Sequence, residues 1–166
     1  IPEPKNILVV DDYEPFRDSL AKILGGAGFR VFPASDGEEA LDILRKEFIH
    51  LVLTDLKMPK MDGTELLKVA KTIRPDIEVL LITGYGTVDT AVTAMKDGAF
   101  DYIEKPFKPR EILKLVRKAV EKQSLVLENR KLQERIKDFQ KVEKIVGRSP
   151  AMKKVLEIVA QVAPSS

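Results

Sequence analysis

Apolar and amphipathic stretches alternate along the first 118 residues of the chain. Between the apolar runs, hydrophobic residues recur at the spacing of one helix face, as at Phe16, Leu20 and Leu24. Four short runs are almost wholly apolar, as buried parallel strands are: residues 7–10, 51–53, 79–82 and 102–103. Strands that alternate with amphipathic helices are typical of a parallel α/β sheet. The pattern therefore predicts five βα units in one three-layer, doubly wound α/β domain.

Residues typical of helix ends support these boundaries. Asp36 and Glu39 form a capping-box pattern ahead of one helix, and Thr87 can cap another. Gly28 is suited to end the first helix, and Pro109 is suited to be the first residue of the fifth. The expected helix ends thus fall between the apolar runs, as five βα units require.

The pattern changes after residue 118. From Glu121 to Lys144 there is no glycine or proline, and charged residues dominate. Apolar residues recur at every seventh position: Leu125, Leu132, Phe139 and Val146. Ile136 occupies the intermediate position of this repeat, and Asn129 occupies the same position one heptad earlier. One interpretation is a solvated helical extension. The other is a dimeric coiled-coil linker over residues 119–144, in which a buried Asn129 sets the register at some cost in stability.

A second change begins at residue 145. Gly147 is expected to break the helix, and Ser149 and Pro150 are suited to start another. The apolar face of that next helix has no obvious partner in this sequence. We therefore expect residues 145–166 to be the start of a further, truncated domain.

Polar residues follow the apolar runs at the points where strands should end. Asp11 and Asp12 follow the first run, Asp55 the second, Thr83 the third and Lys105 the last. Because the carboxyl ends of the strands share one edge of an open α/β sheet, these side chains should meet in one crevice. Carboxylates, a hydroxyl and a lysine together suit a divalent cation plus a phosphoryl group.

These residue types also indicate a division of chemical roles. Mg²⁺ prefers oxygen ligands, which Asp11, Asp12 and Asp55 could supply together with a backbone carbonyl, that of Lys57. Crowded carboxylates repel one another, and a bound cation relieves that repulsion. A carboxylate can itself attack phosphorus, which makes Asp55 the candidate nucleophile. Lys105 would then neutralise charge on the transferred group.

Simpler roles remain open for several of these residues. Asp12 could cap the helix entered at Pro15. Thr83 is either a hydroxyl donor to a phosphoryl oxygen or only a β-branched strand residue, and Lys105 could be an exposed loop lysine. Pro106 offers a cis peptide bond that would aim the backbone at the site.

Composition narrows the classes of function. A net charge of +2 gives no global argument for nucleic-acid or membrane binding. There is no cysteine, and the one histidine, His50, is expected at the opposite end of its strand from Asp55, so we expect no zinc site. No secretory signal and no apolar run near 18 residues is found, which predicts a cytoplasmic protein without a membrane span.

An ordered set of motifs carries a resemblance to a known family. In chain order the motifs are VVDD at 9–12, TDLKMP at 54–59, MDG at 61–63, ITGYG at 82–86 and KPF at 105–107. With these motifs, the chain resembles the receiver domain of two-component response regulators. The resemblance implies a flavodoxin-like fold with strand order 2-1-3-4-5, in a domain over residues 1–118.

The resemblance also implies the roles of the site residues, and the chain departs from the family's catalytic pattern at none of them. The phosphoacceptor is Asp55, Mg²⁺ lies at Asp11 and Asp12, the switch pair is Thr83 and Tyr102, and Lys105 binds the phosphoryl group.

Within the family, residues 83–107, 127–132 and 145–152 are similar to the NtrC-type activators, the last segment to the start of their AAA+ ATPase domain. Those proteins open promoters held by sigma-54 RNA polymerase. The resemblance implies a cognate sensor histidine kinase and a homodimer through the linker or through the face of the fourth helix, fifth strand and fifth helix. Polymerase and promoter DNA would be reached only through domains outside this sequence. No phosphate-binding Gly-x-x-x-x-Gly-Lys loop occurs, so we do not expect the chain itself to hydrolyse ATP.

The function expected from the sequence is therefore a phosphorylation switch, and not an enzyme that acts on a separate substrate. Two alternatives stay open. One is a phosphate-ester hydrolase with an aspartyl intermediate, although such enzymes commonly place the nucleophile after the first strand and Asp55 follows the third. The other is a pure interaction module that no longer takes phosphate.

Overall fold

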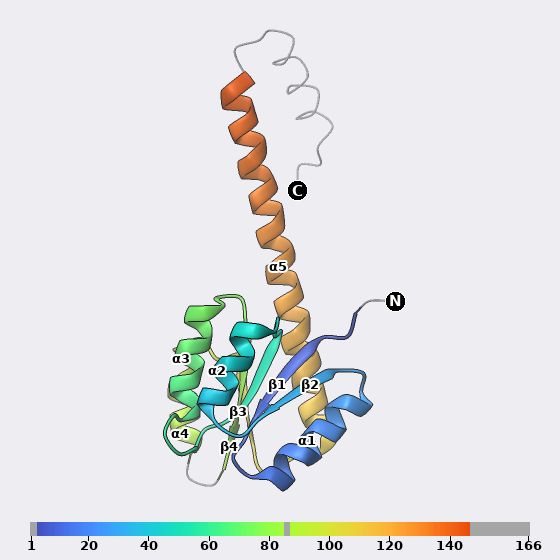
Figure 1. Cartoon of the computed structure of the whole chain (residues 1–166), viewed down its shortest axis with the longest axis vertical. Coiled ribbons are helices and arrows are strands. Elements are labelled where there is room, and N and C mark those ends of the chain that lie inside the picture. Colours follow the sequence, from blue (N-terminus) through green and yellow to red (C-terminus); the bar gives the residue numbers. More distant parts are fainter. Residues whose placement is uncertain (1–2, 85–86, 147–166) are drawn as a thin grey trace. The chain divides into compact units, whose positions relative to one another are not determined.

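The computed structural model describes residues 3–84 and 87–146, the side chains of 142–146 excepted. Strands and helices alternate along the described chain, as the sequence pattern predicted (Figure 1). The elements are β1 (Asn6–Val10), α1 (Glu14–Gly26), β2 (Arg30–Ala34), α2 (Gly37–Lys46), β3 (Leu51–Asp55), α3 (Gly63–Ile73), β4 (Glu78–Thr83), α4 (Val88–Met95), β5 (Asp101–Glu104) and α5 (Pro109–Val146). The expected α/β fold class is confirmed.

The strands form one parallel sheet in the order β2-β1-β3-β4-β5, which confirms the predicted topology. Val10 of β1 pairs with Thr54 of β3, and Asp55 pairs with Ile82 of β4. The carboxyl ends of these strands therefore lie at the same edge. Strand β2 was not marked by an apolar run because it is an edge strand, and it contains Pro33, which an edge tolerates.

Alternate residues of the strands enter two separate cores, one on each face of the sheet. Leu8 and Val10 face a cluster with buried residues of α2, α3 and α4, whereas Ile7 and Val9 face a cluster with α1 and the first turns of α5. Figure 1 shows the same division of the helices. A sheet covered on both faces needs continuous apolar strands, which explains the unbroken runs in the sequence. The loops at its carboxyl edge stay free to carry polar residues.

Helix ends follow the predicted signals with one difference. Asp36 caps α2 by accepting a hydrogen bond from the Glu39 backbone N–H at 2.8 Å, and Pro109 is the first residue of α5. Thr87 occupies the N-cap position of α4, but its hydroxyl donates back to the Gly84 carbonyl and does not cap the helix. The predicted end of the first helix is confirmed: Gly28 directly follows the C-cap of α1, Ala27, and has a φ of +96°, the conformation in which glycine commonly ends a helix.

The chain divides into two compact units, residues 1–125 and 126–166. In the second unit, Asn129, Leu132, Ile136 and Phe139 lie on α5 and are all exposed. Leu125, at the end of the first unit, is exposed as well. The long helix agrees with the predicted helical linker, while the coiled coil and the three domain boundaries stay predictions. The expected break at Gly147 and the ATPase-like segment lie outside the described residues.

Within the described part of the chain, no helix combines the length and the apolar character needed to cross a membrane.

Candidate functional site

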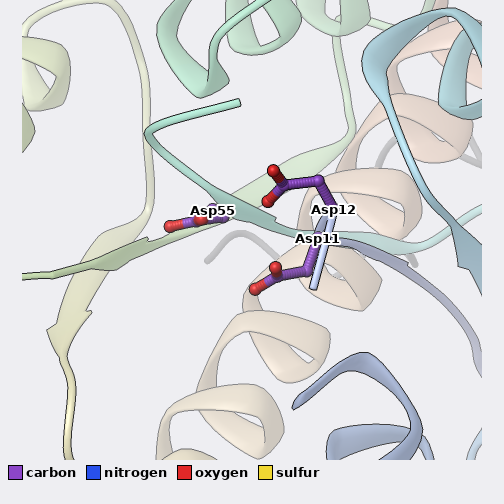
Figure 2. A group of neighbouring side chains, drawn as sticks. All are labelled: Asp11, Asp12 and Asp55. Atoms are coloured by element: carbon purple, nitrogen blue, oxygen red, sulfur yellow. The ribbon is translucent and has the colours of Figure 1, made fainter. Parts of the chain in front are cut away.

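Three carboxylates gather at the carboxyl edge of the sheet. One oxygen each from Asp11, Asp12 and Asp55 lie within 4.8 Å of one another (Figure 2). Asp11 is fully buried and Asp12 is exposed, while the Asp55 side chain is 14% exposed. The group is therefore open to solvent on the Asp12 side. The sequence predicted this convergence from strand ends alone.

Backbone contacts hold Asp11 in place. Its Oδ1 accepts a hydrogen bond from the Tyr13 N–H at 2.9 Å, and its carbonyl accepts one from Arg17 Nη1 at 2.8 Å. Tyr13 is the N-cap residue of α1 and makes no side-chain cap. The alternative role of Asp12 as a helix cap is therefore wrong, since the helix starts one residue too late for it. The Asp12 carboxylate stays available at the site.

Asp55 ends β3 and is held by its main chain. Its carbonyl accepts a hydrogen bond from the Thr54 hydroxyl at 3.0 Å, and the backbone N–H of the next residue, Leu56, donates to the Ile82 carbonyl at 3.1 Å.

Gly63, the first residue of α3, packs directly behind this peptide. A Cβ at Gly63 would lie 2.5 Å from the Asp55 carbonyl oxygen and 2.9 Å from the Leu56 Cα. Only glycine lets α3 start so close to the strand end.

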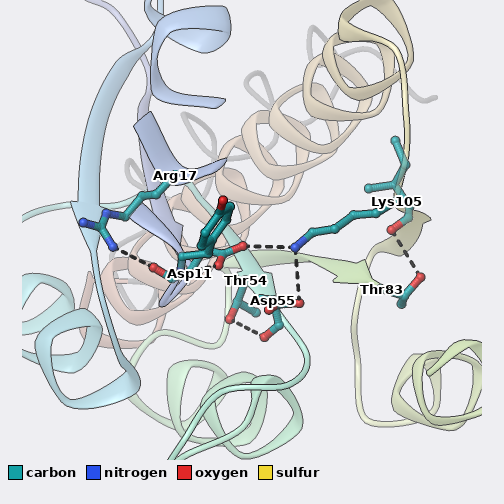
Figure 3. Close-up of polar contacts among 8 residues, drawn as sticks. Asp11, Arg17, Thr54, Asp55, Thr83 and Lys105 are labelled. Carbon is teal, nitrogen blue, oxygen red and sulfur yellow. Dashed lines mark hydrogen bonds and ion pairs between the residues drawn. The ribbon is translucent and has the colours of Figure 1, made fainter. Parts of the chain in front are cut away.

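Lys105 supplies a cation to the acidic group. Its Nζ lies 3.3 Å from Asp11 Oδ2 and 3.9 Å from Asp55 Oδ1, and the side chain is only 30% exposed (Figure 3). The Lys105 N–H donates to the Thr83 carbonyl at 2.8 Å, which ties the residue to the end of β4. The Lys105–Pro106 peptide bond is cis, as predicted. The simpler interpretation of Lys105 as an exposed loop lysine is therefore wrong.

The two residues of the expected switch pair lie on adjacent strands. Thr83 is buried, and its hydroxyl donates to the Ile103 carbonyl at 3.4 Å. Tyr102 is partly buried and packs against the core cluster on the α2–α4 side of the sheet. Whether Thr83 binds a phosphoryl oxygen and whether Tyr102 follows its movement stay predictions.

Lys57 and His50 lie on either side of the strand that ends in Asp55. Lys57 is exposed two residues after Asp55, and the metal-binding role of its carbonyl stays a prediction. His50 precedes β3, as expected, and its Nδ1 accepts a hydrogen bond from the Asn6 N–H at 3.0 Å. Burial lowers the pKa of His50 below its usual range. Its part in the structure is thus to hold the amino end of β1.

The surroundings of Asp55 oppose its ionisation. The pKa of its carboxyl is raised from 3.8 to about 6: burial is the largest cause, the negative charges of Asp11 and Asp12 also raise it, and Lys105 acts in the opposite direction. The lysine thus offsets only part of the combined effect of burial and of repulsion by the other two carboxylates. A hard divalent cation with oxygen ligands would relieve the remainder, so the donor set fits Mg²⁺.

Comparison with known proteins identifies this arrangement. A family model described as the response regulator receiver domain matches residues 7–117. The chain belongs to the response regulator receiver family. Receiver domains are regulatory phosphoacceptors that generally bind Mg²⁺ at an acidic pocket, and response regulators are partners of sensor kinases. The family predicted from the motifs is therefore confirmed.

Relatives of this receiver extend over nearly the whole chain. It is 33% identical over 158 residues to the C4-dicarboxylate transport transcriptional regulatory protein DctD of Rhizobium meliloti (strain 1021), covering 95% of this chain and 34% of that protein. It is 39% identical over 169 residues to the transcriptional regulatory protein ZraR of Klebsiella oxytoca, covering 98% and 36% respectively. These matches confirm the resemblance to NtrC-type regulators. The chain spans about a third of the length of the curated relatives it matches.

Solved structures of response regulators are also similar to this chain. The receiver domain of NtrX from Brucella abortus is similar with a TM-score of 0.67 and 38% identity, over 69% of this chain and 98% of that one. A longer NtrX structure from the same organism gives a TM-score of 0.73 and 34% identity, over 96% of this chain and 35% of that one. The receiver fold thus rests on both sequence and structure.

Two residues that support the receiver site were not found from the sequence. Arg17 belongs to none of the motifs, and it holds the Asp11 carbonyl. Gly63 lies in the motif at residues 61–63, but its packing against the Asp55 peptide was not among the expectations. The Met-Asp-Gly motif at residues 61–63 was the available signal for Gly63, whereas nothing in the local sequence marks Arg17.

The raised pKa of Asp55 predicts a pH dependence of Mg²⁺ binding. Between pH 8 and 7 the apparent affinity should be nearly constant, and below about pH 6 it should fall roughly tenfold per pH unit, because a proton then competes for the same carboxylate. Calorimetric Mg²⁺ titrations at several pH values measure this. An affinity that stays level down to pH 5 would contradict the prediction.

Proposed function

We propose that this receiver is a phosphorylation switch in which a sensor histidine kinase donates a phosphoryl group to Asp55. One observation carries the proposal: the carboxylates of Asp11, Asp12 and Asp55 lie within 4.8 Å of one another, with the Lys105 ammonium 3.9 Å from Asp55. An acidic group with one cation beside it, at the carboxyl edge of the sheet, suits metal-assisted phosphoryl transfer.

Each residue has a role that its surroundings support. Asp55 is the nucleophile, since a carboxylate oxygen can form an aspartyl phosphate. Asp11, Asp12, Asp55 and the Lys57 carbonyl would hold Mg²⁺, which neutralises charge on the transferred group. Lys105 reaches the same position from β5 and adds a second positive charge.

The signal would leave the site through β4 and β5. The Thr83 hydroxyl, which now donates to the Ile103 carbonyl, would turn to a phosphoryl oxygen, and Tyr102 would fill the space it leaves. That change alters the face made by α4, β5 and α5. Because α5 continues to Val146, we propose that a homodimer through the linker transmits the change to a sigma-54 activator ATPase in the parent protein. Contacts with polymerase and promoter DNA would be made by further domains of the parent protein. The cytoplasmic location stays a prediction.

Phosphorylation by a small donor tests the proposal directly. The chain is incubated with acetyl phosphate and Mg²⁺, and its intact mass is measured. We expect the mass to rise by one phosphoryl group. This gain should require Mg²⁺ and should disappear again on standing. A constant mass would reject the switch and favour the pure interaction module, whereas turnover of a generic phosphomonoester would favour the hydrolase.

The linker gives a separate prediction about the homodimer. Leu132 and Ile136 are 49% and 57% exposed on α5, and burial of such side chains would stabilise a pair of helices. Replacing both with glutamate should convert a dimeric chain to a monomer, as measured by light scattering. The matched control places glutamate at Lys131 and Lys137, on the outer positions of the heptad. A dimer that survives the first pair of substitutions would show that the linker does not hold it.

A further inference from the structure

An aromatic ring lies beside the ammonium of Lys105. The Nζ atom is 4.1 Å from the centroid of the Phe16 ring, and the same atom is 3.3 Å from Asp11 Oδ2 and 3.9 Å from Asp55 Oδ1. A cation within about 6 Å of a ring centroid is attracted to the negative face of the ring. Within the described part of the chain, the ammonium therefore lies beside two carboxylates and one uncharged ring.

The Phe16 ring is itself held from two sides. It lies in the first turn of α1, is partly buried, and packs against the core cluster beneath that helix. It also meets the Phe107 ring edge-on, with centroids 5.9 Å apart and an interplanar angle of 80°. Phe107 is two residues after Lys105, so the aromatic pair ties α1 to the segment that carries the lysine.

The carboxylates alone are poor anchors for this lysine during phosphoryl transfer. Asp11 and Asp55 are the residues that we assign to the cation and to the phosphoryl group, and an oxygen engaged in those roles is less available to the ammonium. A lysine side chain is flexible and loses considerable entropy when it is held in one place. A phenyl ring is no ligand for Mg²⁺ and contacts the ammonium without using all three N–H donors.

We propose that Phe16 is a positioning residue that keeps the Lys105 ammonium over the site through a cation–π contact while the carboxylates are engaged. This inference rests on the proposed function and adds a residue to the same site. Phe16 touches no reacting atom, so it acts only through Lys105.

Graded weakening of the ring tests the inference. Phenylalanine analogues with one, two and three fluorine atoms, placed at position 16, reduce the negative charge of the ring face in steps with little change of shape. We expect the logarithm of the rate of Asp55 phosphorylation by acetyl phosphate to fall in step with fluorination. Phe16→Leu should be slower by about three- to tenfold, the range typical of such contacts. The control is Phe29→Leu, which removes a ring from the same core cluster and should leave the rate unchanged.

A second measurement needs neither metal nor phosphate. In the chain without Mg²⁺, the ε-methylene protons of Lys105 should show an upfield ring-current shift by NMR. The shift should persist in Phe29→Leu and disappear in Phe16→Leu. A rate that is level across the fluorinated series, or a missing ring-current shift, would overturn the inference while the proposed function stands. If the unmodified chain takes up no phosphoryl group, the proposed function fails and this inference falls with it.

Discussion

Asp55→Asn is expected to abolish the gain of a phosphoryl group from acetyl phosphate and Mg²⁺. An amide has no anionic oxygen to attack phosphorus. We expect neither of the other two carboxylates to replace Asp55, because Asp11 is buried and paired with Lys105, and Asp12 is exposed. Intact mass measures the loss. A normal mass gain in the variant would show that another residue is the acceptor.

The same variant should gain stability while it loses metal affinity. The folded pKa of Asp55, about 6, lies above its usual value of 3.8, so its contribution to stability is complete below about pH 4 and is lost as the pH rises through 6. At pH 7 without Mg²⁺ the ionised carboxylate is therefore destabilising, and asparagine should raise the free energy of unfolding measured in urea. Asp42→Asn is the matched control, since Asp42 is exposed on α2 and pairs with the exposed Arg45 at 3.6 Å. It should change neither stability nor phosphorylation appreciably.

Gly63→Ala is expected to damage both the fold and the site. The added Cβ would stand 2.5 Å from the Asp55 carbonyl oxygen, and that neighbour is backbone that cannot rotate away. Either α3 or the end of β3 must shift, at a cost of about 1–3 kcal/mol in the free energy of unfolding. Because Asp55 moves with its peptide, phosphorylation should slow by tenfold or more. Urea unfolding and the rate with acetyl phosphate measure the two effects.

Gly25→Ala provides the control for that substitution. Gly25 lies in the last turn of α1, and a Cβ there would meet nothing within 4 Å. Alanine should stabilise the helix by about 0.5–1 kcal/mol, because glycine loses more backbone entropy on folding. The two alanine substitutions should therefore change the free energy of unfolding in opposite directions. A Gly63→Ala variant as stable and as active as Gly25→Ala would contradict the close approach at Asp55.

Much of the site was predictable because a parallel sheet converts sequence order into position. Asp11, Asp55 and Thr83 each end or follow a wholly apolar run, and the topology of such a sheet brings strand ends to one edge. The strands were predictable because burial on both faces requires unbroken apolar residues. Strand β2 lacked this signal because it is an edge strand with exposed residues at Arg30 and Pro33.

The sequence by itself therefore determined the α/β fold class, the order of the elements, the family and the acidic group, since these follow from periodicity and from motifs at strand ends. Only the tertiary structure decided which local neighbours support the site. It showed that Asp12 does not cap α1, that Gly63 packs against the Asp55 peptide, and that Phe16 lies beside the Lys105 ammonium. Phe16 and Lys105 are distant along the chain, and even the nearer contacts depend on distances of a few ångströms that no sequence pattern encodes.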